Sequence, residues 1–432
     1  MQQSSPSSAA SQGTVREIFW AFLRLGLTSF GGPVAHLGYF RSDLVTRRGW
    51  VSDRDYTDLV ALCQVLPGPA SSQAGFGLGL RRAGLPGALA AFAAFTLPSA
   101  LLMYLLAAGT QVLTGPLWSG ALVGLQAVAV AVVAHAVIGM ARTLTPDLQR
   151  LSIGVAALTA ALLWPGGVTQ LIVIAGGAAL GTWWCVAAAR STLARHTAHA
   201  LGATGSPDAA RAPEGDLPLT DDRGRVTRRT GTASLTILGA LLVAASLLGR
   251  SVGDSWLSLV AASLRAGSFV FGGGHVVLPL LHSEFVATGW VSEADFAAGY
   301  GVAQAMPGPL FSFAAYLGAI ADVGPGGAAG ATLALVAIFI PGFLLLLGAL
   351  PFWALLRGSA RGNAAVLGAS AAVVGLLAAA LAHLVTQAAG NGPWALAIAL
   401  GCGLALYWRP PLWLVVLLAA AAGAALSLLG MH

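Results

Sequence analysis

Residues 24–33 read RLGLTSFGGP, and the same stretch returns at residues 265–274 as RAGSFVFGGG. The similarity extends beyond this stretch, and the matching residues of the first copy are, in order, Arg24, Gly26, Phe30, Gly31, Gly32, Gly49, Trp50, Gln64, Pro67, Gly68 and Pro69. Those of the second copy are Arg265, Gly267, Phe271, Gly272, Gly273, Gly289, Trp290, Gln304, Pro307, Gly308 and Pro309. Chance does not produce so many ordered identities that include tryptophan and proline, so the chain is predicted to consist of two homologous halves.

The composition indicates that both halves lie in a membrane. Of the 432 residues, 57% are hydrophobic and only 9% are charged, with a mean hydropathy of +0.79. A soluble domain carries about 25% charged residues. Apolar runs long enough to span a bilayer recur along the chain, without the short alternating segments that are typical of an outer-membrane barrel. The predicted fold class is therefore an all-α polytopic membrane protein.

The apolar runs between glycine, proline and arginine predict about thirteen transmembrane segments. The first half has runs near residues 15–35, 56–80, 84–109, 117–140, 148–164 and 168–189. An extra run at 233–249 precedes those near 256–280, 294–320, 326–350, 363–386, 393–408 and 411–430. Six spans and the extra one bring the second half to the opposite side of the membrane. The halves are therefore predicted to be inverted repeats with broken helices, the architecture of secondary transporters.

These runs divide the chain into five parts. Residues 1–14 are rich in Ser, Ala and Gln and lack the features of a signal peptide, so we expect a disordered cytoplasmic tail. Residues 15–189 form the first repeat and residues 250–432 the second. Between them, residues 190–232 carry arginines, acidic residues and prolines, as expected of a cytoplasmic polar linker, and residues 233–249 form an extra transmembrane helix.

Arginines near the span ends predict a protein of the inner membrane with a cytoplasmic N-terminus and an outside C-terminus. One loop conflicts with this orientation. Arg41, Arg47, Arg48 and Arg54 follow the first predicted span and would lie outside. The conflict indicates that the first segment is re-entrant or only dips into the membrane.

The glycines and prolines of the repeat are the first candidates for a binding site. Pro67, Gly68 and Pro69, like Pro307, Gly308 and Pro309, interrupt apolar runs, and two prolines so close together must break a helix. Such a break either lines a polar cavity or is a structural kink. Gly31 and Gly32, with Gly272 and Gly273, would let backbone amides approach an anion, or would serve close helix packing.

Polar side chains inside the predicted spans are the second candidates. Arg24 and Arg265 offer planar forks of donors suited to a tetrahedral oxyanion, although each could also reach an interface or pair with backbone carbonyls. Gln64 and Gln304 could donate to the anion or satisfy carbonyls freed by the prolines. The side chains that could titrate during proton coupling are His36, His275, His282, Glu284 and Asp55.

The sequence does not predict an enzyme. No His and Asp residues stand at metal-ligand spacing, no nucleophile stands with its base, and the three cysteines are isolated in apolar segments. We expect no cofactor, no metal and no nucleic-acid partner. The expected partners are a small anion and the lipid bilayer, and a homodimer stays open.

The repeated motifs resemble the chromate ion transporter family. The resemblance rests on the run from Phe22 to Pro33, on Gly49, Trp50 and Val51, and on Gln64 with Pro67, Gly68 and Pro69. The second copy, from Arg265 to Pro309, repeats these motifs, so the chain is similar to the long two-domain form.

This resemblance implies a secondary transporter that exports chromate across the cytoplasmic membrane, driven by the membrane potential or the proton gradient, and that gives chromate resistance. It also implies a relation to sulfate, which has the same charge and tetrahedral shape, so a carrier of sulfate or another small anion is the alternative. A sensor or scaffold without transport would tolerate the loss of Arg24 or Arg265.

Overall fold

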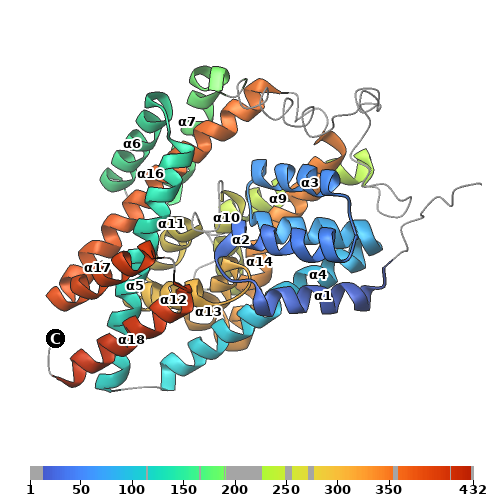
Figure 1. Ribbon diagram of the computed structural model, residues 1–432. Helices are drawn as coiled ribbons and strands as arrows, with labels where there is room; N and C mark the ends of the chain where they lie inside the picture. The colour runs from blue at the N-terminus through green and yellow to red at the C-terminus, as the bar shows by residue number, and fades with distance from the viewer. Residues whose placement is uncertain are drawn as a thin grey trace, which may run out of the picture.

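The computed structural model describes residues 13–112, 115–164, 167–188, 190, 226–248, 255–270, 277–353, 359–408 and 410–429. Within these ranges the regular secondary structure is helical and no strand occurs (Figure 1). Most of the predicted tail and linker, residues 1–12 and 191–225, lie outside the described residues. Five of the described helices are long and apolar enough to cross a membrane, and shorter apolar helices accompany them. The all-α polytopic class is confirmed, whereas the number of about thirteen segments stays a prediction.

The helices follow one another in the same order in both halves. The first half has α1 (Val15–Thr28), α2 (Gly32–Phe40), the π-helical turn η1 (Arg41–Arg47), α3 (Asp53–Val65), α4 (Ala70–Val112), α5 (Pro116–Leu144), α6 (Leu148–Leu163) and α7 (Gly167–Trp184). After α9 (Arg228–Leu248), the second half has α10 (Trp256–Ser268), α11 (Val277–Leu281), the π-helical turn η4 (His282–Val286), α12 (Glu293–Ala305), the short 3-10 helix η5 (Leu310–Ser312), α13 (Phe313–Ile320), α14 (Gly327–Ala349), η6 (Leu350–Phe352), α16 (Ala360–Gly390), α17 (Pro393–Tyr407) and α18 (Leu412–Leu428).

The repeated Gly-Trp-Val-Ser motif begins a helix in each half. The Ser52 hydroxyl accepts a hydrogen bond from the Asp55 amide (3.1 Å), and the Ser292 hydroxyl accepts one from the Asp295 amide (3.0 Å). A serine in this place satisfies one of the free amides at a helix start. The motif therefore marks the first turns of α3 and α12.

The first two predicted spans are helical hairpins. The chain breaks after α1, where Gly31 and Gly32 take positive φ angles, and returns so that Trp50 Nε1 donates to Glu17 Oε1 (3.1 Å). The chain therefore reverses direction within the runs predicted at 15–35 and 56–80, in agreement with the expectation that the first segment is re-entrant or only dips into the membrane. The physical reason is that left-handed glycines and the Pro-Gly-Pro segment reverse the chain midway.

The second hairpin, α3 with the start of α4, also closes on itself. Arg81 pairs with Asp55 (2.9 Å), and Arg82 lies 3.5 Å from Glu17. Ala83 and Gly84 leave helical geometry before α4 continues. The open ends of both hairpins thus meet on one side, and the loop carrying Arg41 to Arg54 lies on that same side. The charge conflict noted in the sequence disappears.

The second half repeats the α3–α4 hairpin in α12 and α13. The Asp322 amide donates to the Trp290 carbonyl (2.9 Å), and the Tyr316 hydroxyl donates to the Asp295 carbonyl (3.2 Å). These contacts hold the start of α12 beside the end of α13.

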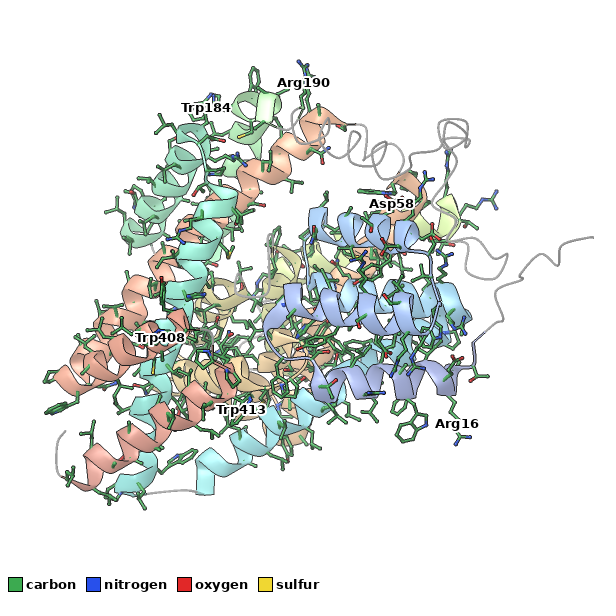
Figure 2. All side chains as sticks on the ribbon, viewed as in Figure 1. Arg16, Asp58, Trp184, Arg190, Trp408 and Trp413 are labelled. Carbon is green, nitrogen blue, oxygen red and sulfur yellow. The ribbon has the colours of Figure 1, made fainter. Side chains whose placement is uncertain are left out.

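The long helices interlock the two halves. α6 and α7 pack against α16, while α17 and α18 pack against α5. Glycines allow this close approach, because a side chain at Gly124 would meet the backbone of Ala419 and one at Gly181 would meet that of Ala364. Apolar side chains cover the outside: Trp184, Trp408 and Trp413 project from the bundle with 48%, 76% and 43% of their surface exposed (Figure 2). The described residues form a membrane protein with a lipid-facing surface.

Candidate functional site

The hairpins of the two halves touch at their tips through two equivalent hydrogen bonds. The Gly68 amide donates to the Val270 carbonyl (2.7 Å), and the Gly308 amide donates to the Ser29 carbonyl (2.9 Å). We call these four residues the crossing. Each half thus places its Pro-Gly-Pro tip on the helix break of the other half, where α1, α3, α10 and α12 end.

Only glycine fits the two tips. Gly68 and Gly308 have φ angles of 125° and 96°, which other residues rarely adopt. A Cβ at Gly308 would also lie 2.9 Å from Ser99 Oγ, and a Cβ at Gly68 would lie 2.9 Å from Gln73 Nε2. The crossing therefore depends on both glycines.

Buried polar side chains gather around the crossing in the first half. We call this set the polar cluster: Ser29, His36, Ser71, Ser72, Gln73, Thr96 and Ser99. None of them is more than 2% exposed. Burial of so many polar groups costs free energy unless each has a partner.

Several contacts join the polar cluster to the crossing. His36 Nδ1 lies 3.3 Å from Ser71 Oγ, and the imidazole also interacts with the Ser29 backbone. Ser99 Oγ, which Gly308 approaches, donates to the Thr96 carbonyl (3.0 Å). The cluster and the second-half tip thus form one site.

Gln73 ties the other tip to the same site. Its Nε2 donates to the Pro67 carbonyl (3.1 Å) and to the Gly342 carbonyl (2.9 Å) on α14. Gln73 thus connects the first-half tip with a long helix of the second half.

Five atoms of the polar cluster have no hydrogen-bond partner among the described residues. They are Ser29 Oγ, His36 Nε2, Ser72 Oγ, Gln73 Oε1 and Thr96 Oγ1. Buried polar atoms in proteins almost always have partners, and each exception requires an explanation. A polar ligand or water held at the crossing would satisfy these groups.

The start of α4 adds a favourable potential for an anion. Ser71 and Ser72 stand in the first turn of α4, directly after Pro69, where free amides carry partial positive charge. Hydroxyl groups and an imidazole can donate to oxyanion oxygens without a fixed charge on the protein. The arrangement can therefore hold a small oxyanion between neutral donors.

The second half has apolar side chains in most of the equivalent places. Ser29 corresponds to Val270, His36 to Val277, Ser71 to Phe311, Gln73 to Phe313 and Thr96 to Phe339, and these five counterparts are buried. Ser72 corresponds to Ser312, but the Ser312 hydroxyl donates to the Pro309 carbonyl (2.8 Å). The site is therefore asymmetric, with its polar groups in the first half.

The structure brings some of the predicted residues together at the crossing. Gly68 and Gly308 lie in it, and Pro67, Pro69, Pro307 and Pro309 flank them. The predicted helix breaks at these segments are confirmed, since α3 ends at Val65 and α12 ends at Ala305. Gly31 and Gly32 form the break beside Ser29. Gly272 and Gly273 lie outside the described residues, as does His275.

The two arginines make different contacts, and none of these contacts involves the crossing. Arg265 binds Glu284 with two hydrogen bonds (2.9 and 2.5 Å) and donates to the Ala245 carbonyl (2.6 Å). Arg24 is exposed on α1, and its side chain has no ion pair within the described part of the chain. Each of the three guanidinium nitrogens of Arg265 thus donates one hydrogen bond within the protein, and the structure does not bring the two arginines to one anion.

The two predicted glutamines also differ. Gln64 is exposed at the end of α3, whereas Gln304 is partly buried and hydrogen-bonds to Tyr300. Sequence reasoning missed the polar cluster, except for His36. The available signal was the Ser-Ser-Gln run at 71–73, which the second half replaces by Phe-Ser-Phe.

Comparisons with known proteins place these observations in a family. The family model described as chromate transporter matches residues 16–182 and 257–424. The chromate transport protein of Pseudomonas aeruginosa is 30% identical, over 94% of this chain and 90% of that protein. The probable chromate transport protein of Synechococcus elongatus is 29% identical over 95% of each, and the chromate transport protein of Cupriavidus metallidurans is 26% identical over 89% and 86%. No solved structure matches the chain significantly.

Proposed function

The chain belongs to the chromate transporter family, and from this premise we propose that it carries chromate out of the cell across the cytoplasmic membrane. Like its relatives, it is a transporter and not an enzyme. The single observation that carries the proposal is the set of buried, unpartnered polar atoms at the crossing. Broken helices that meet between two repeats are where secondary transporters bind their substrates.

Chromate is a tetrahedral dianion that needs several donors around it. In the proposal, Ser29, Ser72, Thr96 and His36 donate to its oxygens, and the start of α4 adds its partial charge. Gly68 and Gly308 keep the two tips close to the ion. Arg265 then supports the fold near the site, because its guanidinium is held by the Glu284 carboxylate.

The contacts of the long helices support inverted repeats. From Gly177 to Gly181, α7 passes α16 from Ala372 back to Ala364, so these helices are antiparallel. α6 passes α16 in the parallel direction, with Gly154 at Ala371 and Leu158 at Gly375. If α5, α6 and α7 alternate across the membrane, α16 runs opposite to its counterpart α5. The division into repeats at 15–189 and 250–432 is part of this proposal.

The hairpins also support a cytoplasmic N-terminus and an outside C-terminus in the inner membrane. With both first-half hairpins opening to the cytoplasm, the arginines on that side are Arg16, Arg41, Arg47, Arg48, Arg54, Arg81, Arg82, Arg142 and Arg150. The second-half hairpins then open to the outside, where arginines are rare. This distribution follows the positive-inside rule.

The packing of the hairpins supports alternating access. On the outer side α12 packs along α5, where Gly301 lies against the Leu125 backbone. On the inner side α3 packs against α4 and η1, and no comparable packing with α16 occurs within the described residues. We therefore assign this conformation to a state that is closed outside and open inside.

Export is the direction that the membrane potential favours. A dianion that leaves a cell with a negative interior gains about 4.6 kcal/mol per 100 mV, twice the value for one charge. Export of this kind lowers the cellular chromate concentration and gives resistance.

The experiment measures chromate accumulation in a sensitive bacterial host that expresses the chain at controlled membrane abundance. The wild type should lower cellular chromate, and Ser72→Ala should reduce this effect about tenfold, as the loss of one hydrogen bond to a charged group predicts. Ser312→Ala is the matched control, because its hydroxyl already binds Pro309. Unchanged chromate in wild-type cells would overturn the proposed function. Equal effects of both variants would overturn the site.

A further inference from the structure

A second polar group, partly exposed, lies in the second half, apart from the crossing. His282 Nε2 lies 3.0 and 2.9 Å from the two carboxylate oxygens of Glu293. His282 is the first residue of η4, and Glu293 is the first residue of α12. Their side chains are 20% and 41% exposed. The pair therefore joins the start of α12 to the neighbouring hairpin.

α16 contributes two further side chains to this pair. The ring of His383 stacks on that of His282, with centroids 6.0 Å apart and planes at 14°. Gln387, one turn further along α16, hydrogen-bonds to Glu293. Three elements thus meet at two imidazoles and one carboxylate.

The other charged groups around His282 are already engaged. Arg265 on α10 binds Glu284 of η4, and Asp295 on α12 accepts from the Ser292 hydroxyl (2.6 Å). α11 carries no charged side chain. The charge of the group therefore depends on His282, Glu293 and His383.

The equivalent place in the first half holds a permanent ion pair. Arg41 corresponds to His282 and Asp53 to Glu293, and the guanidinium binds the carboxylate at 2.6 and 3.0 Å. Arginine keeps its charge at every physiological pH, whereas a histidine changes charge between about pH 5 and pH 8. His383 has no histidine counterpart, since Gly139 stands at its place in α5. Of these two equivalent contacts, only the one in the second half contains a group that can change its charge near neutral pH.

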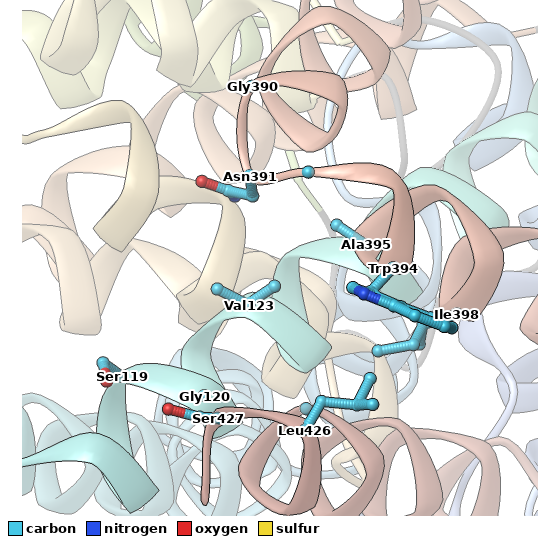
Figure 3. Close-up of a pocket in the computed structure, with 12 residues that line it drawn as sticks. Ser119, Gly120, Val123, Gly390, Asn391, Trp394, Ala395, Ile398, Leu426 and Ser427 are labelled. Carbon is cyan, nitrogen blue, oxygen red and sulfur yellow. The ribbon is translucent and has the colours of Figure 1, made fainter. Parts of the chain in front are cut away.

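Two further polar side chains, Gln126 and Asn391, lie close to the start of α12. Asn391, one turn after Gln387 on α16, donates to Gln126 Oε1 (2.5 Å), and Gln126 Nε2 donates to the carbonyl of Ala294, next to Glu293. Asn391 borders a pocket of about 340 Å³ with Ser119 and Ser427 (Figure 3). In the proposed topology this pocket opens to the outside.

We propose that His282, Glu293 and His383 form a proton-binding site that controls the closure of α12 on the outer side. With the proton bound, the imidazolium attracts the Glu293 carboxylate and holds α12 to η4 and α16, as Arg41 holds α3 to η1. Without the bound proton, the attraction between the imidazole and the Glu293 carboxylate is lost, and α12 can move away from α5. Because α12 leads into the tip that carries Gly308, proton binding from the outside then affects the release of the anion. This inference rests on the proposed transport function.

The test compares wild type with His282→Arg, which copies the first-half pair, and with Arg41→Lys, a control that keeps a fixed charge there. Chromate flux into proteoliposomes is measured from pH 6 to pH 8 at a clamped potential and is divided by the concentration of the chromate dianion, because chromate itself takes up a proton in this range. We expect the wild-type and Arg41→Lys fluxes to change about tenfold over this range, as for one titrating histidine, and the His282→Arg flux to stay constant. A flux with the same pH profile in all three would overturn the inference and leave the proposed function intact.

A second readout does not depend on chromate. Hydrogen exchange of the α12 amides, corrected for the intrinsic effect of pH, should show weaker protection at pH 8 than at pH 6 in wild type and equal protection in His282→Arg. If wild-type protection does not change with pH, the inference is wrong. If protection changes but no chromate flux occurs at any pH, the proton site stands and the proposed function fails.

Discussion

The two halves share one scaffold but carry different side chains at equivalent places. At the crossing, the first half has unpartnered hydroxyls and an imidazole, while the second half has valine and phenylalanine. At the open ends of the hairpins, the first half has the fixed Arg41–Asp53 pair, and the second has His282 with Glu293. The duplication thus supplies the symmetry of the fold. Anion binding and proton binding are assigned to opposite halves.

The largest expected effect is a difference in stability between the alanine variants of the two repeated arginines. Arg265→Ala leaves the Glu284 carboxylate, whose side chain is only 14% exposed, without its partner. Loss of one member of a buried pair costs about 3 kcal/mol or more, so the thermal stability in detergent should fall clearly. Arg24→Ala, at an exposed position, should leave it within about 0.5 kcal/mol. Equal losses of stability would contradict the asymmetry.

The glycine tips are alike in the two halves, since Gly68 and Gly308 both have positive φ angles. Gly308→Ala forces alanine to a φ of 96° and brings its Cβ to 2.9 Å from Ser99 Oγ, and such strain alone costs about 1–3 kcal/mol. Chromate flux should fall more than about tenfold. Gly327→Ala, at a φ of 50° with open space around it, is the control and should retain flux. If both variants lose flux equally, the close contact at the crossing has no specific role.

Exchange of a residue of one half for its counterpart in the other half tests whether anion binding depends on the first half. His36→Val places in the first half the residue type that Val277 has in the second half, and it removes one hydrogen-bond donor. The KM for chromate should therefore rise about tenfold or more, as expected for the loss of a hydrogen bond to a charged group. The fold should tolerate it, since valine fits the equivalent place. Val277→His buries an unpartnered imidazole and should cost about 1–3 kcal/mol of stability without any gain in binding. An unchanged KM in His36→Val would remove His36 from the site.

The smallest effect concerns the exposed pair of the first half. Arg41 holds the pKa of Asp53 below its ordinary value, mainly through the hydrogen bond between them. The stabilisation is therefore present above the ordinary aspartate pKa of 3.8 and is lost as the pH falls through the lowered value. Arg41→Ala should remove this dependence, so the melting curves of variant and wild type should converge under strongly acidic conditions. Curves that stay equally separated at every pH would refute it.

Much of the fold could be predicted from the sequence. Glycine and proline break helices through their own backbone, so the breaks at Gly31 and at Pro67 to Pro69 follow from local chemistry. Several apolar runs, such as 117–140, 326–350 and 363–386, match single long helices, since burial in lipid sets their length. Segments 15–35 and 56–80 show the limit, because a run of this length either spans the membrane or folds back. Contacts between residues far apart in the chain, such as those of Glu17 with Trp50 and of Asp55 with Arg81, distinguish these cases.

The site was harder to predict because it depends on partners far apart in the chain. Arg265 and Arg24 look equivalent in sequence, yet only Arg265 forms an ion pair with the acidic residue that follows it, Glu284. Asp43, the first-half counterpart of Glu284, pairs with Arg47 and Arg48 instead. Ser72 and Ser312 occupy equivalent places, but of the two hydroxyls only that of Ser312 has a hydrogen-bond partner in the part of the chain that the structure describes. Such differences arise from side-chain packing, which a repeat alignment does not contain.

The most direct test of the central claim is the position of chromium in crystals of the protein grown with chromate, located by its anomalous scattering. We predict one chromium peak at the crossing, within hydrogen-bond reach of Ser72 and His36 and close to Gly308. A peak beside Arg24 or Arg265, or a peak among the apolar counterparts Val277 and Phe313, would contradict the account.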